Sequence, residues 1–197
     1  MKQKPIYCLL LTFILAGCAT EPTQYYLLDS RAPAVSTENS NGIWLGIKPV
    51  TLPEYLDRME IVTRATAHRL NVAVFDVWAE PLETNTTNVL ADALAQLVHT
   101  DRIVLLANES ANTDYNLGVD IERFERQPDG TVLLAAEWTI EHAESGAPEI
   151  VGSANIHESI TGKGYDAIVA AMSRALYQLS DKIAAEVGEL KPADSIT

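Results

Sequence analysis

The pattern that most constrains the fold lies between residues 117 and 156, where apolar and polar side chains alternate along three successive segments. Such alternation is typical of strands with one buried face. Residues 127–130 (QPDG) join the first two segments by a turn, because proline presets φ and glycine takes the left-handed position. Residues 145–148 (SGAP) join the second to the third. The apolar rows are Leu117, Val119 and Ile121; Val132, Leu134, Ala136, Trp138 and Ile140; and Ile150, Ala154 and Ile156. The sequence therefore predicts an antiparallel meander with one solvated face.

Two further segments repeat apolar side chains at the spacing of an amphipathic helix. The first follows Pro81, which suits the first turn of a helix, and has its apolar stripe over residues 89–98. The second runs from about Tyr165 to Val187 and is ended by Gly188. Together with the meander, they predict an α+β fold, in which an antiparallel-rich mixed β-sheet has both helices packed on one face.

Shorter apolar segments predict the remaining strands. They cover residues 25–28, 43–47, 59–64 and 70–74, with a turn at residues 52–58. Residues 103–106 (IVLL) are apolar throughout, which predicts a short central strand.

The first 17 residues have the order of a secretory signal peptide. Two lysines precede an uncharged run at residues 6–15, and the small residues Ala16 and Gly17 follow. Ten apolar residues are too few for a membrane-spanning helix, which needs about 20. Residues 15–18 (LAGC) resemble a bacterial lipobox, in which the cysteine takes a diacylglycerol and becomes the new N-terminus. The alternative is an ordinary secreted protein in which Cys18 is unmodified.

Lipidation of Cys18 would divide the chain into four parts. Residues 1–17 are a lipoprotein signal peptide, 18–24 a lipidated tether, 25–188 a single α+β domain and 189–197 a polar tail. The tether from Ala19 to Gln24 reaches at most about 20 Å. Ala19 stands where an aspartate usually retains lipoproteins at the inner membrane, which favours the periplasmic face of the outer membrane. Cys8 would leave with the leader, so the mature chain would form no disulfide.

Charge and motifs argue against several functions. The formal charge of −13 becomes −15 without the two leader lysines, which disfavours nucleic acid and anionic lipid surfaces as electrostatic partners. His68, His99, His142 and His157 lack metal-ligand spacing, and residues 161–164 (TGKG) lack the spacing of a phosphate-binding loop. We therefore expect no catalytic residues, no metal and no cofactor; a lipid-modifying hydrolase is the weakest hypothesis.

The turn LPEYLDR at residues 52–58 has two interpretations. It is a structural turn with an ion pair from Asp57 to Arg58 or Arg64, or it is a docking surface made of Tyr55, Leu56, Asp57 and Arg58. Trp78, in the segment WAEPL that joins a strand to the first helix, is expected to fill the core.

Several segments resemble the auxiliary lipoprotein family of ABC-type and MCE-type transport systems. They are the lipobox with Cys18, YYLLDS (25–30), GIWLGIKPVTLPEYLDRMEIVTR (42–64), WAEPL (78–82) and NVLADALAQLV (88–98). The resemblance implies a non-enzymatic, palmitate-bearing subunit of an intermembrane lipid transport system. It would be anchored at the outer membrane, dock the MCE protein that bridges from the inner membrane, form a homo-oligomeric ring and support membrane integrity. The alternative is an envelope-assembly or structural lipoprotein with other partners.

Overall fold

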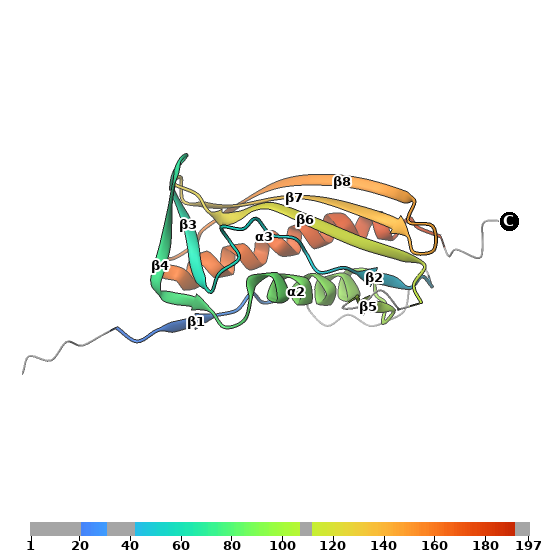
Figure 1. Ribbon diagram of the computed structural model, residues 1–197, viewed down its shortest axis with the longest axis horizontal. Helices are drawn as coiled ribbons and strands as arrows, with labels where there is room; N and C mark the ends of the chain where they lie inside the picture. The colour runs from blue at the N-terminus through green and yellow to red at the C-terminus, as the bar shows by residue number, and fades with distance from the viewer. Residues whose placement is uncertain (1–20, 31–41, 107–111, 192–197) are drawn as a thin grey trace, which may run out of the picture.

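The computed structural model describes residues 21–30, 42–106 and 112–191. The elements in these residues carry the labels of Figure 1. The strands are β1 (Gln24–Tyr26), β2 (Leu45–Ile47), β3 (Glu60–Thr66), β4 (Arg69–Trp78), β5 (Ile103–Leu105), β6 (Tyr115–Arg126), β7 (Thr131–His142) and β8 (Pro148–Ser159). The helices are α2 (Leu82–Leu97) and α3 (Gly164–Val187).

The strands form one mixed sheet, which confirms the predicted α+β class. The order is β1-β4-β3-β6-β2-β5, and β7 and β8 extend the sheet from the other side of β6. The longest pairings, β6 with β7 and β7 with β8, are antiparallel, as is β3 with β4. The pairings of β1 with β4, β2 with β5, and β6 with both β2 and β3 are parallel. The meander therefore forms as predicted, with Gly130 at a positive φ of 87° in the first turn. Its second face is not solvated throughout, because Leu133, Ala135 and Glu125 are buried there.

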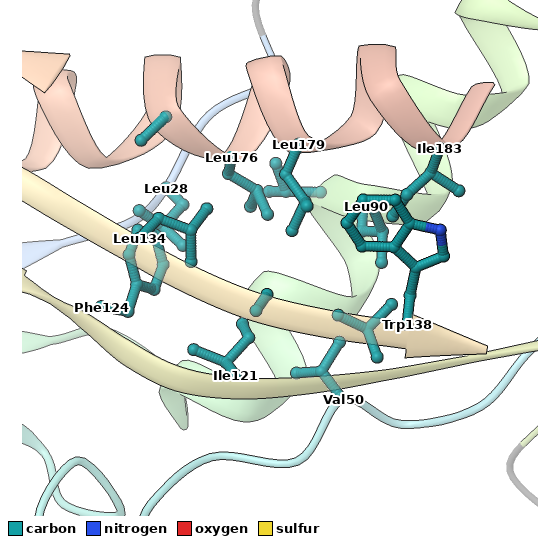
Figure 2. Packing of buried hydrophobic residues seen from close by; sticks show 14 of the residues in the cluster. Leu28, Val50, Leu90, Ile121, Phe124, Leu134, Trp138, Leu176, Leu179 and Ile183 are labelled. Carbon is teal, nitrogen blue, oxygen red and sulfur yellow. The ribbon is translucent and has the colours of Figure 1, made fainter. Parts of the chain in front are cut away.

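Both helices pack on the same side of this sheet, and α3 runs along the meander (Figure 1). Figure 2 shows Leu176, Leu179 and Ile183 of α3 pointing at side chains of β6 and β7. The indole N–H of Trp138 on β7 donates to Glu186 on α3 at 2.6 Å. The Cα partner of Trp138 on β8 is Gly152, where a Cβ would lie 2.3 Å from the indole ring. The large Trp138 side chain thus requires glycine beside it.

The prediction of a central strand at residues 103–106 is wrong. In the part of the chain that the structure describes, β5 is the last strand on its side of the sheet and pairs with β2 alone. Its Leu105 is 45% exposed. An apolar run of four residues has no polar alternation to distinguish a buried strand from an edge strand, so its place depends on tertiary pairing. Trp78, by contrast, is buried in the core as expected.

At one end of the molecule, β3 and β4 cross the direction of the meander (Figure 1). Their register shifts sharply, because Glu60 pairs with Val77 whereas Val62 pairs with Val72. The extra residues of β4 make a bulge, and bulges bend a strand. Beyond this bulge, β4 pairs with β1, which places the first described strand at the same end.

Candidate functional site

Cys18 lies outside the described residues, and the described chain starts at Glu21. β1 begins six residues after Cys18 and pairs in parallel with β4, with Gln24 opposite Asp76 and Tyr26 opposite Trp78. The hydroxyl of Tyr26 donates to Asp76 at 2.8 Å. The first strand is therefore fixed to the sheet, and residues 21–23, which precede it, lie at the end of the molecule formed by β3 and β4 (Figure 1).

In the turn at residues 52–58, Tyr55 and Leu56 face the protein, whereas the two residues that follow face solvent. Leu56 is buried in the core, and Tyr55 packs against it. Asp57 and Arg58 are exposed. Short backbone hydrogen bonds hold the turn, among them Leu56 N–H to Pro53 O at 2.9 Å and Arg58 N–H to Leu56 O at 2.8 Å. The four residues predicted as one docking surface are thus not all available at the surface.

Tyr55 is part of a buried ionic cluster around Glu125, which the sequence did not predict. The Tyr55 hydroxyl donates to Glu125 Oε2 at 2.8 Å. Arg64 and Arg123 donate to Glu125 Oε1 at 2.8 and 2.9 Å, and the Gln127 amide donates to the same oxygen at 3.1 Å. The Glu125 side chain is fully buried, whereas those of Arg64 and Arg123 are partly exposed. Arg64 therefore pairs with Glu125, and the predicted ion pair between Asp57 and Arg64 is wrong.

The cluster shifts the ionisation of its members. Burial raises the pKa of the Glu125 carboxyl, but the hydrogen bonds from Arg64, Arg123 and Tyr55 outweigh burial and hold its pKa below the ordinary value. Burial and the hydrogen bond to Glu125 raise the pKa of Tyr55 to about 12. At neutral pH, the cluster is a carboxylate held by two guanidinium groups and a neutral phenol.

Strand alternation did not identify Glu125, because it predicts only which residues share a face. Arg123 and Glu125 lie two apart on β6 and so share a face. A register shift between Ile121 and Arg123 then moves Phe124 into the row of buried apolar residues. Glu125 is buried on the other face by Tyr55 and Arg64, which lie some sixty to seventy residues earlier in the chain. The pair Arg123–Glu125 was a signal for an ion pair but not for its burial.

A groove of about 640 Å³ lies between β1 and the N-terminal half of α3. Tyr25, Tyr26 and Leu27 line one side, and Val169, Ala170 and Tyr177 contribute apolar surface on the helix. Arg174, also at the groove, donates to Glu158 Oε1 at 2.6 Å and to the Ser159 carbonyl at 2.9 Å. No predicted site residue lines this groove. No local sequence pattern indicates the groove, because its lining comes from segments about 140 residues apart.

None of the helices in the described residues is long and apolar enough to cross a membrane. Within the same residues, no group of three or more His, Cys, Asp or Glu side chains could hold a metal ion.

The molecule is thus a small α+β domain with a fixed first strand, a groove beside that strand and a polar cluster under one turn. The model of the family described as "ABC-type transport auxiliary lipoprotein component" matches residues 25–184, and the chain belongs to this family.

Among curated proteins, the chain is similar to the intermembrane transport lipoprotein PqiC of Escherichia coli (strain K12). The two are 25% identical over 179 residues, which cover 89% of this chain and 93% of that protein. The PqiC of Shigella flexneri gives the same identity and coverage.

Solved structures share the fold. One, described as an uncharacterized protein, is 24% identical, with a TM-score of 0.71 over 85% of this chain and 99% of its own. Protein XCC0632 from Xanthomonas campestris is 19% identical, with a TM-score of 0.67 over 89% and 97% of the two chains.

Proposed function

We propose that this chain is the outer-membrane-anchored, periplasmic lipoprotein subunit of an MCE-type intermembrane lipid transport system. In this role it docks the bridging MCE protein at the outer membrane and supports membrane integrity. The observation that carries the proposal is the family match over residues 25–184, directly after a lipobox that ends at Cys18. The relatives named as intermembrane transport lipoproteins cover nearly the same length.

The anchor acts through Cys18. Two or more acyl chains, such as palmitate, hold a protein stably on a membrane, because each buried CH₂ contributes about 0.8 kcal/mol. Since β1 is paired with β4, only residues 19–23 remain between the anchor and the sheet. Gln24, where the sheet begins, is six residues from Cys18, a span of at most about 20 Å. The domain therefore stays close to its leaflet and can hold a partner there.

The subunit acts by docking and not by catalysis. In the turn at residues 52–58, Asp57 and Arg58 are the exposed side chains that meet the MCE partner. Tyr55 and Leu56 fix the turn to the domain: Tyr55 by its hydrogen bond to Glu125, and Leu56 by its burial in the core. Several copies assemble as a ring at the end of the bridging protein.

The test replaces the anchoring cysteine. Cys18→Ala should leave the protein without lipid, abolish its capture of the MCE protein by crosslinking in the periplasm and weaken the outer-membrane barrier. Cys8→Ala is the matched control, since Cys8 is removed with the leader and the mature protein should be unchanged. Intact mass should show a wild-type chain that begins at acylated Cys18.

Two results would contradict the proposal. A wild-type mass with a bare thiol, or with another N-terminus, removes the anchor. Crosslinking that recovers only other envelope proteins removes the MCE partner and favours an envelope-assembly role.

A further inference from the structure

Large apolar side chains gather on the surface of one end of the molecule. In the described residues, eight large hydrophobic side chains are exposed, and five of them belong to β1, β4 or the residues next to β1 and β3. These five are Tyr25, Leu27, Met59, Val72 and Val74, and we name them the apolar end. Val74 is 76% exposed and Tyr25 is 70% exposed, which is far from core packing.

The backbone connects these side chains at the base of β4. The N–H of Trp78 donates to the Met59 carbonyl at 2.7 Å, and the N–H of Ala79 donates to the Tyr26 carbonyl at 2.9 Å. β1 and Met59 are therefore both fixed to the last residues of β4. Val72 and Val74 continue the apolar end along the strand that crosses this end of the molecule (Figure 1).

Charge is low on this hairpin, although the chain is acidic. Residues 60–78 contain two acidic side chains, Glu60 and Asp76, and two basic ones, Arg64 and Arg69, whereas the whole chain carries −13. Arg64 is engaged by Glu125, and Asp76 accepts from Tyr26. The hairpin therefore has no net charge to repel an anionic surface.

The place of the tether indicates what covers the apolar end. Glu21, the first described residue, is three residues from Cys18, a distance of at most about 11 Å when extended. Exposed apolar patches mark interaction sites, and tyrosine is enriched where proteins meet the lipid headgroups. From these observations, we infer that the apolar end rests in the interfacial region of the lipid leaflet to which Cys18 is anchored. The inference rests on the proposed anchoring.

This contact fixes the orientation of the domain. β3, β4 and β1 face the membrane, and the far turn of the meander, at residues 143–147, points away from it (Figure 1). The contact comes from apolar burial, so it should persist when the salt concentration is raised.

A pair of matched positions tests the orientation. Val74→Cys and Val151→Cys each replace an exposed valine, 76% and 73% exposed, but Val151 lies on β8, outside the apolar end. Full-length protein purified from membranes is labelled with an environment-sensitive fluorophore and reconstituted in phosphatidylethanolamine–phosphatidylglycerol vesicles. A nitroxide-bearing lipid then serves as quencher. We expect a blue shift at position 74 and a fluorescence loss several times larger than at position 151.

The outcomes separate the orientation from the anchor. Equal quenching at both positions of an acylated protein overturns the apolar-end contact and leaves the anchor intact. A label at position 74 that is shielded without vesicles, with crosslinks between copies, means that a second copy covers the apolar end and also overturns the contact. If the intact mass shows that Cys18 carries no lipid, the quenching of the labels at positions 74 and 151 is compared in a protein that also carries Cys18→Ala. Quenching at position 74 then supports the contact without the anchor, and protein that does not float with vesicles overturns both.

Discussion

The two faces of β6 are stabilised in different ways. On one face, Ile121 and Phe124 point into the apolar core between β6 and α3 (Figure 2), and Leu117 is buried in the same core. On the other, Glu125 is equally buried, but its neighbours are two arginines, a tyrosine and a glutamine. The same strand therefore carries both a packed hydrocarbon face and a buried ionic cluster.

The difference decides how each face tolerates change. Apolar burial is non-directional and roughly proportional to area, so loss of one contact leaves the others intact. A buried ionic cluster is stable only while every member has its partners, because an unpaired buried charge costs several kcal/mol. We therefore expect the polar face to be the more sensitive of the two.

The largest effect is expected at the centre of the cluster. Glu125→Ala leaves Arg64 and Arg123 without their carboxylate and Tyr55 without its acceptor. The loss of one partner of a buried ion pair costs about 3 kcal/mol or more, and the partial exposure of the arginines favours the lower value. Urea unfolding followed by circular dichroism measures the change in the free energy of unfolding.

Glu122→Ala is the control, because Glu122 lies on the same strand and is exposed. It should change the free energy of unfolding by no more than about 0.5 kcal/mol. If both variants lose the same stability, the cluster has no special role and the contrast between the two faces of β6 fails.

The contrast also explains how much of the molecule could be predicted from the sequence. Alternation over Leu117–Ile121 predicted the meander and its core face, because period-two burial is a local property. The place of IVLL at a sheet edge and the burial of Glu125 depend on strands distant in the sequence, so no local pattern reports them. At the turn, no local pattern separates half-buried Tyr55 and buried Leu56 from exposed Asp57 and Arg58, because only the fold covers the first two.

The apolar face of the sheet continues onto β7 and β8, where Gly152 fits tightly against Trp138. A substitution there should have an intermediate effect on stability. Gly152→Ala would place a Cβ 2.3 Å from the Trp138 ring, which is buried and bound to Glu186. Since the ring must move, the substitution should cost about 1 to 3 kcal/mol, as overpacking of cores does. Thermal unfolding checks the stability, and tryptophan fluorescence reports the displaced ring.

Ser153→Ala is the control, because Ser153 is the next residue on β8 and is exposed. It should leave the melting temperature nearly unchanged. A Gly152→Ala variant with wild-type stability would mean that the β7–β8 pair shifts to accept the methyl group. The apolar face would then be more adaptable than its packing indicates.

The smallest effects on stability are expected in the turn, where they also test the docking proposal. Tyr55→Phe removes the 2.8 Å hydrogen bond to Glu125 and keeps the ring, so it should cost about 1 kcal/mol. Arg58→Ala changes an exposed side chain and should cost no more than about 0.5 kcal/mol. Crosslinking to the MCE protein should show the opposite order, with a marked loss for Arg58→Ala and little for Tyr55→Phe. If Arg58→Ala left crosslinking unchanged, the exposed residues of the turn would not be the docking surface. If the two variants lost stability and crosslinking in proportion, the turn would act through the fold alone, and the distinction between the residues that face the protein and those that face solvent would have no functional meaning.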